Sequence, residues 1–150
     1  MRSIITAALV MTTAAVLSAH VTVSPRESAA GASERYTVRV PTEGQVSTTA
    51  VELEVPASVT VTDVPTGADY KVETRRDGNR IVAITWTREI KPRESADFTF
   101  TATNPASGEL AWKAHQRFAD GTSADWTGVA GDRRPAAVTR IVAGPAASPK

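Results

Sequence analysis

The feature that most constrains the fold is an alternation of apolar and polar side chains in several short segments. Residues 34–41 read ERYTVRVP and residues 50–56 read AVELEVP. Residues 97–103 and 110–118 follow the same pattern. A period of two residues places every second side chain on one face of a β-strand, and no segment has the period of an amphipathic helix. The chain is therefore expected to be all-β.

Turn signals separate these segments at intervals of about ten residues. Asp77-Gly78 and Asp120-Gly121 are typical of tight hairpin turns, in which glycine readily adopts a positive φ. We predict a single antiparallel β-sandwich of about seven to nine strands, with an immunoglobulin-like or cupredoxin-like Greek key. The predicted domain covers residues 20–143, and the small, proline-rich tail 144–150 is expected to be disordered.

Residues 1–19 have the layout of a secretory signal peptide. Arg2 precedes an apolar run that is too short to favour a transmembrane anchor, and Ala19 is a small residue suited to the position before a cut. Cleavage after Ala19 makes His20 the first residue of the mature protein, whereas a competing cut after Ala15 would leave four residues ahead of it. The protein is therefore expected to be secreted or extracytoplasmic, in the periplasm or cell envelope.

Composition narrows the functional classes of the processed chain. Removal of the leader leaves 131 of 150 residues, and because Arg2 is the only charged side chain lost, 16 of the 17 basic residues remain against 16 acidic ones. This balance, without a basic run, argues against nucleic-acid binding. The chain has no cysteine, and both methionines lie in the leader. With two histidines and no thiol, nucleophilic catalysis has few residues to use, so we do not expect an enzyme.

A histidine at a free N-terminus offers two nitrogen donors to one metal ion, its α-amine and the nearer imidazole nitrogen. The α-amine has a pKa of about 7.7–8.0, so it releases its proton to a metal more readily than a lysine side chain does. Nitrogen donors combined with carboxylate and water favour Cu(II), and the processed chain lacks the sulfur ligands that Cu(I) prefers. A mature chain beginning at His20 therefore predicts a Cu(II) site.

Other candidate side chains remain open to two interpretations from the sequence alone. Glu34 has the parity of the inward-facing residues of its strand, so it is either a carboxylate at the rim of the buried face or a solvated strand end. Trp126, like Trp86 and Trp112, would by default belong to the core or its rim. His115 shares a strand face with basic residues, which predicts solvent exposure rather than metal contact.

Three motifs together resemble the YcnI family of bacterial extracytoplasmic copper-binding domains. They are HVTV from residue 20, ERYTVRVP from residue 34, and NPASGELAWKAHQRFADGTSADWTG over 104–128. The likeness extends from His20 to about Ile141. It implies a β-sandwich in which a single-histidine brace holds Cu(II). It further implies that His20 supplies the amine and imidazole, that Glu34 supplies a carboxylate, and that the ring of Trp126 lies beside the metal without being a ligand.

The resemblance implies a copper carrier, buffer or metallochaperone without turnover. It points to another extracytoplasmic copper protein or a copper transporter as the exchange partner. Two alternatives stay open: an oxidative enzyme with a histidine brace, in which only His115 could add a second imidazole, and a sandwich for adhesion or scaffolding that binds no metal. Many relatives continue into a C-terminal membrane helix, but no apolar segment follows residue 143, so the mature chain is expected to have no membrane span.

Overall fold

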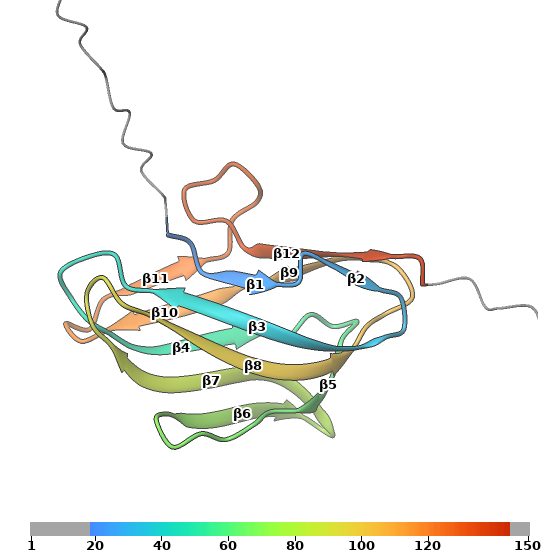
Figure 1. The fold of residues 1–150 in the computed structure, drawn as a ribbon, viewed down its shortest axis with the longest axis horizontal. Helices are drawn as coiled ribbons and strands as arrows, with labels where there is room; N and C mark the ends of the chain where they lie inside the picture. The colour runs from blue at the N-terminus through green and yellow to red at the C-terminus, as the bar shows by residue number, and fades with distance from the viewer. Residues whose placement is uncertain (1–18, 145–150) are drawn as a thin grey trace, which may run out of the picture.

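A computed structural model describes residues 19–144, which form a β-sandwich of twelve strands (Figure 1). The expected signal peptide, apart from Ala19, and the expected tail, apart from Gly144, lie outside the described residues. Over 19–144, no helix is long and apolar enough to cross a membrane. In chain order the strands are β1 (Thr22–Ser24), β2 (Glu27–Ala29), β3 (Ser33–Pro41), β4 (Thr48–Glu54), β5 (Thr60–Asp63), β6 (Lys71–Asp77), β7 (Arg80–Ile90), β8 (Ser95–Thr103), β9 (Gly108–Trp112), β10 (Ala114–Phe118), β11 (Ser123–Trp126) and β12 (Ala137–Val142).

The strands are arranged in three sheets. One sheet has the order β1-β3-β8-β5, the sheet facing it has the order β11-β10-β4-β7-β6, and a smaller sheet has the order β2-β12-β9. The all-β sandwich predicted from the sequence is confirmed. Among the twelve strands of residues 19–144, all pairings are antiparallel except that of β2 with β12, which is parallel.

The predicted number of strands, seven to nine, was too low for two physical reasons. The three-residue strands β1 and β2 are too short to show an alternating pattern. In addition, the alternating run 110–118 is divided at Lys113 between β9 and β10, because its pairing passes there from β12 to β4 and β11. Both predicted hairpins are present, and their turns contain Gly78 at φ +60° and Gly121 at φ +84°.

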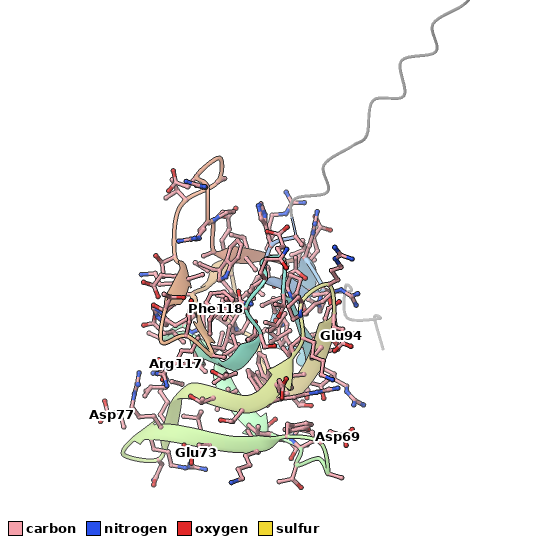
Figure 2. The ribbon with its side chains drawn as sticks, turned by 90° about the vertical axis from the view of Figure 1, so that its left-hand side faces the viewer. Asp69, Glu73, Asp77, Glu94, Arg117 and Phe118 are labelled. Carbon is pink, nitrogen blue, oxygen red and sulfur yellow. The ribbon has the colours of Figure 1, made fainter. Side chains whose placement is uncertain are left out.

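The core lies between the two larger sheets and is rich in aromatic side chains. Trp86 and Trp112 are almost completely buried, as the sequence predicts. The ring of Trp86 stacks on that of Phe98, with centroids 5.3 Å apart and an interplanar angle of 14°. Charged side chains lie at the periphery of the molecule, as Figure 2 shows for Glu73 and Asp77. Burial of the apolar faces therefore holds together a fold that has no disulfide.

The pairing of β1 with β3 determines where the N-terminal segment lies. The two strands are antiparallel, with Thr22 opposite Arg39 and Ser24 opposite Thr37. The residues that precede β1 therefore lie beside the C-terminal end of β3 and the turn that follows Pro41. In Figure 1 this is also the end of the sandwich at which β10 and β11 form a hairpin.

Candidate metal centre

The segment Ala19–His20 lies at one end of the sandwich, against residues of two other elements. The His20 and Trp126 rings have centroids 5.4 Å apart and an interplanar angle of 52°. The backbone N–H of Ala19 donates a hydrogen bond to Oε1 of Glu43, at 2.5 Å. His20 is half-buried, and Glu43 is exposed. An imidazole, a carboxylate and an indole ring thus surround the backbone at which the predicted cleavage would create a new amine.

Trp126 is held in place by a buried glutamine. Its Nε1–H donates to Oε1 of Gln116, at 3.1 Å, and Nε2 of Gln116 donates to the carbonyl of Pro41 at 2.9 Å and to the Thr48 hydroxyl at 2.7 Å. Gln116 is only 2% exposed. Its amide therefore links strands β10, β11, β3 and β4 immediately beneath the indole ring, and a fully bonded buried amide of this kind fixes side-chain positions.

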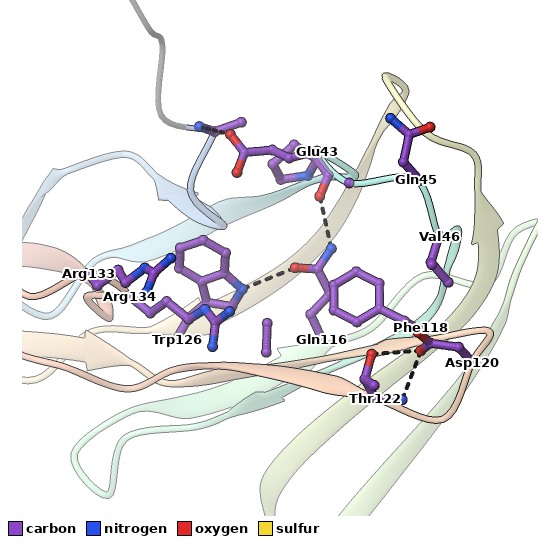
Figure 3. Close-up of a pocket in the computed structure, with 14 residues that line it drawn as sticks. Glu43, Gln45, Val46, Gln116, Phe118, Asp120, Thr122, Trp126, Arg133 and Arg134 are labelled. Atoms are coloured by element: carbon purple, nitrogen blue, oxygen red, sulfur yellow. Dashed lines mark hydrogen bonds between the residues drawn. The ribbon is translucent and has the colours of Figure 1, made fainter.

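A cavity of about 380 Å³ opens beside this network (Figure 3). Its walls include the apolar rings of Trp126 and Phe118 and the charged side chains of Glu43, Arg133 and Arg134. A second cavity, of about 360 Å³, is lined by His20 and neighbouring residues of β1 and the loop before β12. Ala19 lines the first cavity and His20 the second, so the predicted cleavage site lies between them.

The structure does not bring Glu34 to His20, so two residues of the ligand set implied by the resemblance lie apart in it. Arg39 of β3 is the partner of Thr22. Glu34 precedes Arg39 by five residues, near the N-terminal end of β3, where it is opposite Ala102. At a rise of about 3.3 Å per residue this is roughly 17 Å along the strand, in the direction away from His20. Glu34 is half-buried at the opposite end of the sandwich, so the carboxylate close to the N-terminal segment is that of Glu43.

His115 lies in β10, in the same sheet as Trp126, and its side chain is on the outer face of that sheet, as its strand parity predicts. Its Nδ1 is 2.7 Å from Oδ1 of Asp125, and its Nε2 is 2.9 Å from Oε2 of Glu54. The adjacent Gln116 points inward toward Trp126, so His115 points away from the N-terminal site. Over residues 19–144 there is no group of three or more histidine, cysteine, aspartate or glutamate side chains placed to hold a metal ion.

The two carboxylates around His115 give a prediction for stability against pH. The hydrogen bond with Asp125 raises the pKa of His115; partial burial opposes this effect, and the bond with Glu54 adds to it. A folded-state pKa above the unfolded value of about 6.5 means that the stabilisation is fully present below pH 6.5 and is lost as the pH rises through the folded pKa. In copper-free protein, we therefore expect His115→Gln to lower Tm more at pH 5.5 than at pH 8.5. A decrease in Tm that is the same at both pH values would show that protonated His115 does not stabilise the fold through these two carboxylates.

Sequence reasoning missed Glu43 and Gln116, although one signal pointed to the first of them. When adjacent strands pair in antiparallel order, the residue before one strand lies opposite the end of the next, not its beginning. Applied to the short run after His20, this rule selects the turn after Pro41, which contains Glu43. Gln116 had no such signal, because its role depends on partners in three other strands.

The fold and the site define an immunoglobulin-like β-sandwich whose N-terminal segment lies beside a tryptophan-lined cavity. A solved structure of an uncharacterized protein from Nocardia farcinica, described as having an immunoglobulin-like fold, is similar, with a TM-score of 0.66, 24% identity and coverage of 81% of this chain and 97% of that one. A non-cellulosomal cohesin from Archaeoglobus fulgidus is similar, with a TM-score of 0.52, 15% identity and coverage of 83% and 91%. These two likenesses show the fold alone.

The family model for a domain of unknown function (DUF1775) matches residues 20–147, and the chain belongs to this family. The chain is also 38% identical, over 128 residues, to a protein of Bacillus subtilis (strain 168) named copper-binding protein CutI. The match covers 83% of this chain and spans 63% of the length of that relative. The family expected from the sequence motifs is thereby confirmed.

Proposed function

We propose that the protein is an extracytoplasmic Cu(II)-binding protein that carries or buffers copper without turnover. The ion is bound by the α-amine and imidazole of His20 after cleavage behind Ala19. The observation that carries this proposal is the position of the His20 ring, 5.4 Å from that of Trp126, together with a carboxylate beside the adjoining backbone nitrogen. The copper-binding name of the Bacillus relative and a family match that begins at residue 20 support it.

The residues around the N-terminal segment fit Cu(II) chemistry. The imidazole of His20 and the new amine supply two nitrogen donors, and the carboxylate of Glu43 supplies an oxygen donor. In the uncleaved chain Glu43 contacts the nitrogen of Ala19, and the nitrogen of His20 is the next one along the backbone. Consecutive residues are only about 3.8 Å apart, so the amine formed at His20 would lie close to the carboxylate of Glu43. A set of nitrogen and oxygen donors without sulfur suits Cu(II) rather than Cu(I).

A carrier role is favoured over an oxidative enzyme by the position of the second histidine. An enzyme with a two-histidine brace needs another imidazole at the metal, but His115 points from the opposite face of the sheet and is bonded to Asp125 and Glu54. The position of Trp126 suits a protected binding site, because its indole covers one side of the N-terminal segment. A carrier must also release its ion to a partner. Ala19 and His20 are only half-buried at the end of the sandwich, so the proposed site is accessible to such a partner.

Stoichiometric copper is expected to quench tryptophan fluorescence in protein that begins at His20. Cu(II) quenches a nearby indole strongly, and Trp126 is the tryptophan whose ring contacts His20, whereas Trp86 and Trp112 lie in the core. The quenching should saturate at one equivalent and should be mostly lost in Trp126→Phe. Full quenching in that variant, or no quenching in the native sequence, would exclude a site beside Trp126.

Glu43→Gln is expected to weaken Cu(II) binding by about tenfold or more, because loss even of a group that only supports metal ligands costs about 10–100-fold, while the amide oxygen of glutamine can still approach the ion. The substitution keeps the shape of the side chain but removes the negative charge that offsets the charge of the ion. Glu34→Gln is the matched control, because it makes the same change at the other end of β3. Isothermal titration in a non-coordinating buffer compares the two variants. A larger loss in Glu34→Gln would restore the ligand set implied by the resemblance.

A further inference from the structure

The loop between β11 and β12 places two arginines beside the candidate metal centre. Arg133 and Arg134 both line the cavity of about 380 Å³ (Figure 3), and Figure 1 shows their loop projecting from the sandwich next to the N-terminal segment. Within residues 19–144, neither side chain makes an ion pair or a hydrogen bond with another residue. Both arginines are exposed, so their guanidinium groups can pair with a ligand that enters the cavity.

Hydrogen bonds within the loop fix the backbone that carries these two arginines. Its ends are joined by hydrogen bonds from Gly128 N–H to the Arg134 carbonyl, at 2.9 Å, and from Ala136 N–H to the Gly128 carbonyl, at 2.9 Å. Asp132 closes the tip by accepting from the Val129 N–H at 2.9 Å. A Cβ at Gly128 would lie 2.5 Å from an Asp132 oxygen, so the close packing of the loop requires glycine there. A fixed backbone reduces the entropy lost when the arginines bind a ligand.

The charged side chains that line the cavity indicate that an anion would bind more tightly once copper is present. Among its lining residues, Arg133 and Arg134 are balanced by Glu43 and Asp120. Asp120 already accepts hydrogen bonds from the backbone and hydroxyl of Thr122, at 3.0 and 2.6 Å, and these bonds lower its pKa. Glu43 faces the N-terminal segment. A divalent copper ion bound at His20, next to Ala19 at the edge of this cavity, would add positive charge beside it, and an anion in the cavity would then offset that charge.

The walls of the cavity indicate the chemical class of that anion. The amide of Gln116 is occupied by its three partners, so the charged donors that line the cavity are the two arginines. Trp126 and Phe118 offer apolar rings on which a carbon skeleton can pack. Arginine pairs with a carboxylate through two parallel hydrogen bonds, and the volume of the cavity is at the lower end of the range for small-molecule sites.

We propose that this cavity binds a small organic carboxylate together with copper, through Arg133 and Arg134. The proposal rests on the proposed copper function, because the ion supplies the excess charge. Binding is then reciprocal: copper tightens the binding of the carboxylate, and the carboxylate tightens the binding of copper by the same factor. The protein would thus bind its ion as a ternary complex with an organic acid.

The test is a titration of succinate into protein that begins at His20, with and without one equivalent of Cu(II). Copper binding is first measured alone, in a non-coordinating buffer, so that failure of the copper function is recognised separately. We expect succinate to bind the copper-loaded protein more tightly than the copper-free protein. Replacing both arginines by glutamine should weaken succinate binding by about tenfold or more, the size expected for lost charge-assisted hydrogen bonds. Copper affinity measured alone should not fall, because the removed charges repel the ion.

Arg26→Gln is the matched control, because Arg26 lines the other cavity beside the N-terminal strand. It should change succinate affinity by less than about twofold, since exposed charges outside the site are screened by salt. If Arg26→Gln lost as much succinate affinity as the double variant, the effect would come from the overall charge of the protein and not from this cavity, and the proposal would be overturned. Unchanged succinate affinity in the double variant would also overturn it. Tighter binding of inorganic phosphate or of a blocked acidic peptide would assign the arginines to a different ligand.

Discussion

Protein that retains the four residues Val16–Ala19 ahead of His20 is expected to bind Cu(II) at least about 100-fold more weakly than protein that begins at His20. The extra residues convert the α-amine of His20 into an amide and move the free amine too far along the chain to complete a chelate with the imidazole. Loss of groups that merely support metal ligands costs 10–100-fold in affinity, so removal of a ligand is expected to cost at least as much as the upper end of that range. Competition titration against a chelator of known affinity measures the difference.

The control for this comparison is the same extension placed after Lys150, which leaves the N-terminus unchanged. It should not alter copper affinity. Acetylation of the amine of His20 should have the same effect as the four added residues, because both remove the same donor while keeping the imidazole. Equal affinity in the native, extended and acetylated proteins would show that the backbone nitrogen is not a ligand.

Gln116→Leu is expected to lower the free energy of unfolding by about 2–4 kcal/mol, because it leaves several buried polar groups without partners. The Nε1–H of Trp126, the carbonyl of Pro41 and the hydroxyl of Thr48 all bond to this one amide. For a domain of this size the loss corresponds to a decrease in Tm of roughly 10 °C. Thermal unfolding followed by circular dichroism measures it.

Gln45→Leu serves as the control, because Gln45 lines the same cavity but is exposed. Its Tm should stay close to that of the native sequence. The fluorescence of Trp126 should also respond to copper less strongly in Gln116→Leu, because the indole is no longer held against His20. Similar Tm values for the two leucine variants would show that the buried amide is not a structural link.

Much of the fold follows from local sequence patterns, because burial of one strand face requires alternation. In β3, for example, Tyr36, Val38 and Val40 are completely buried, as their spacing predicts. The pattern does not specify which strands pair, and the change of sheet at Lys113 leaves no trace in it. Three-residue strands such as β1 and β2 are likewise too short to give a periodic signal.

The candidate site was predictable only in part. The motifs around His20 and Trp126 selected two residues that the structure brings into ring contact, although they are separated by most of the chain. The resemblance selected Glu34, whose strand parity left two interpretations open, but antiparallel pairing places the end of that strand, not its beginning, beside the N-terminal segment. Parity specifies the face of a sheet on which a side chain lies, whereas register specifies its position along the sheet. Register was the missing information.

The candidate site contains fewer than three metal-binding side chains, because one of the proposed donors is a backbone nitrogen. Within residues 19–144, no group of three or more histidine, cysteine, aspartate or glutamate side chains is placed to hold a metal ion. The proposed amine donor would form only on removal of the expected leader. The proposal therefore couples copper binding to processing, and we expect unprocessed protein not to compete for the ion.

Native mass spectrometry of the exported protein is the decisive measurement, because it reports the first residue and the bound metal together. We expect a chain that begins at His20, with an unmodified amine and one copper ion. A chain beginning at Val16 or at any other residue, or an intact His20 chain that retains no copper from a stoichiometric supply, would contradict it.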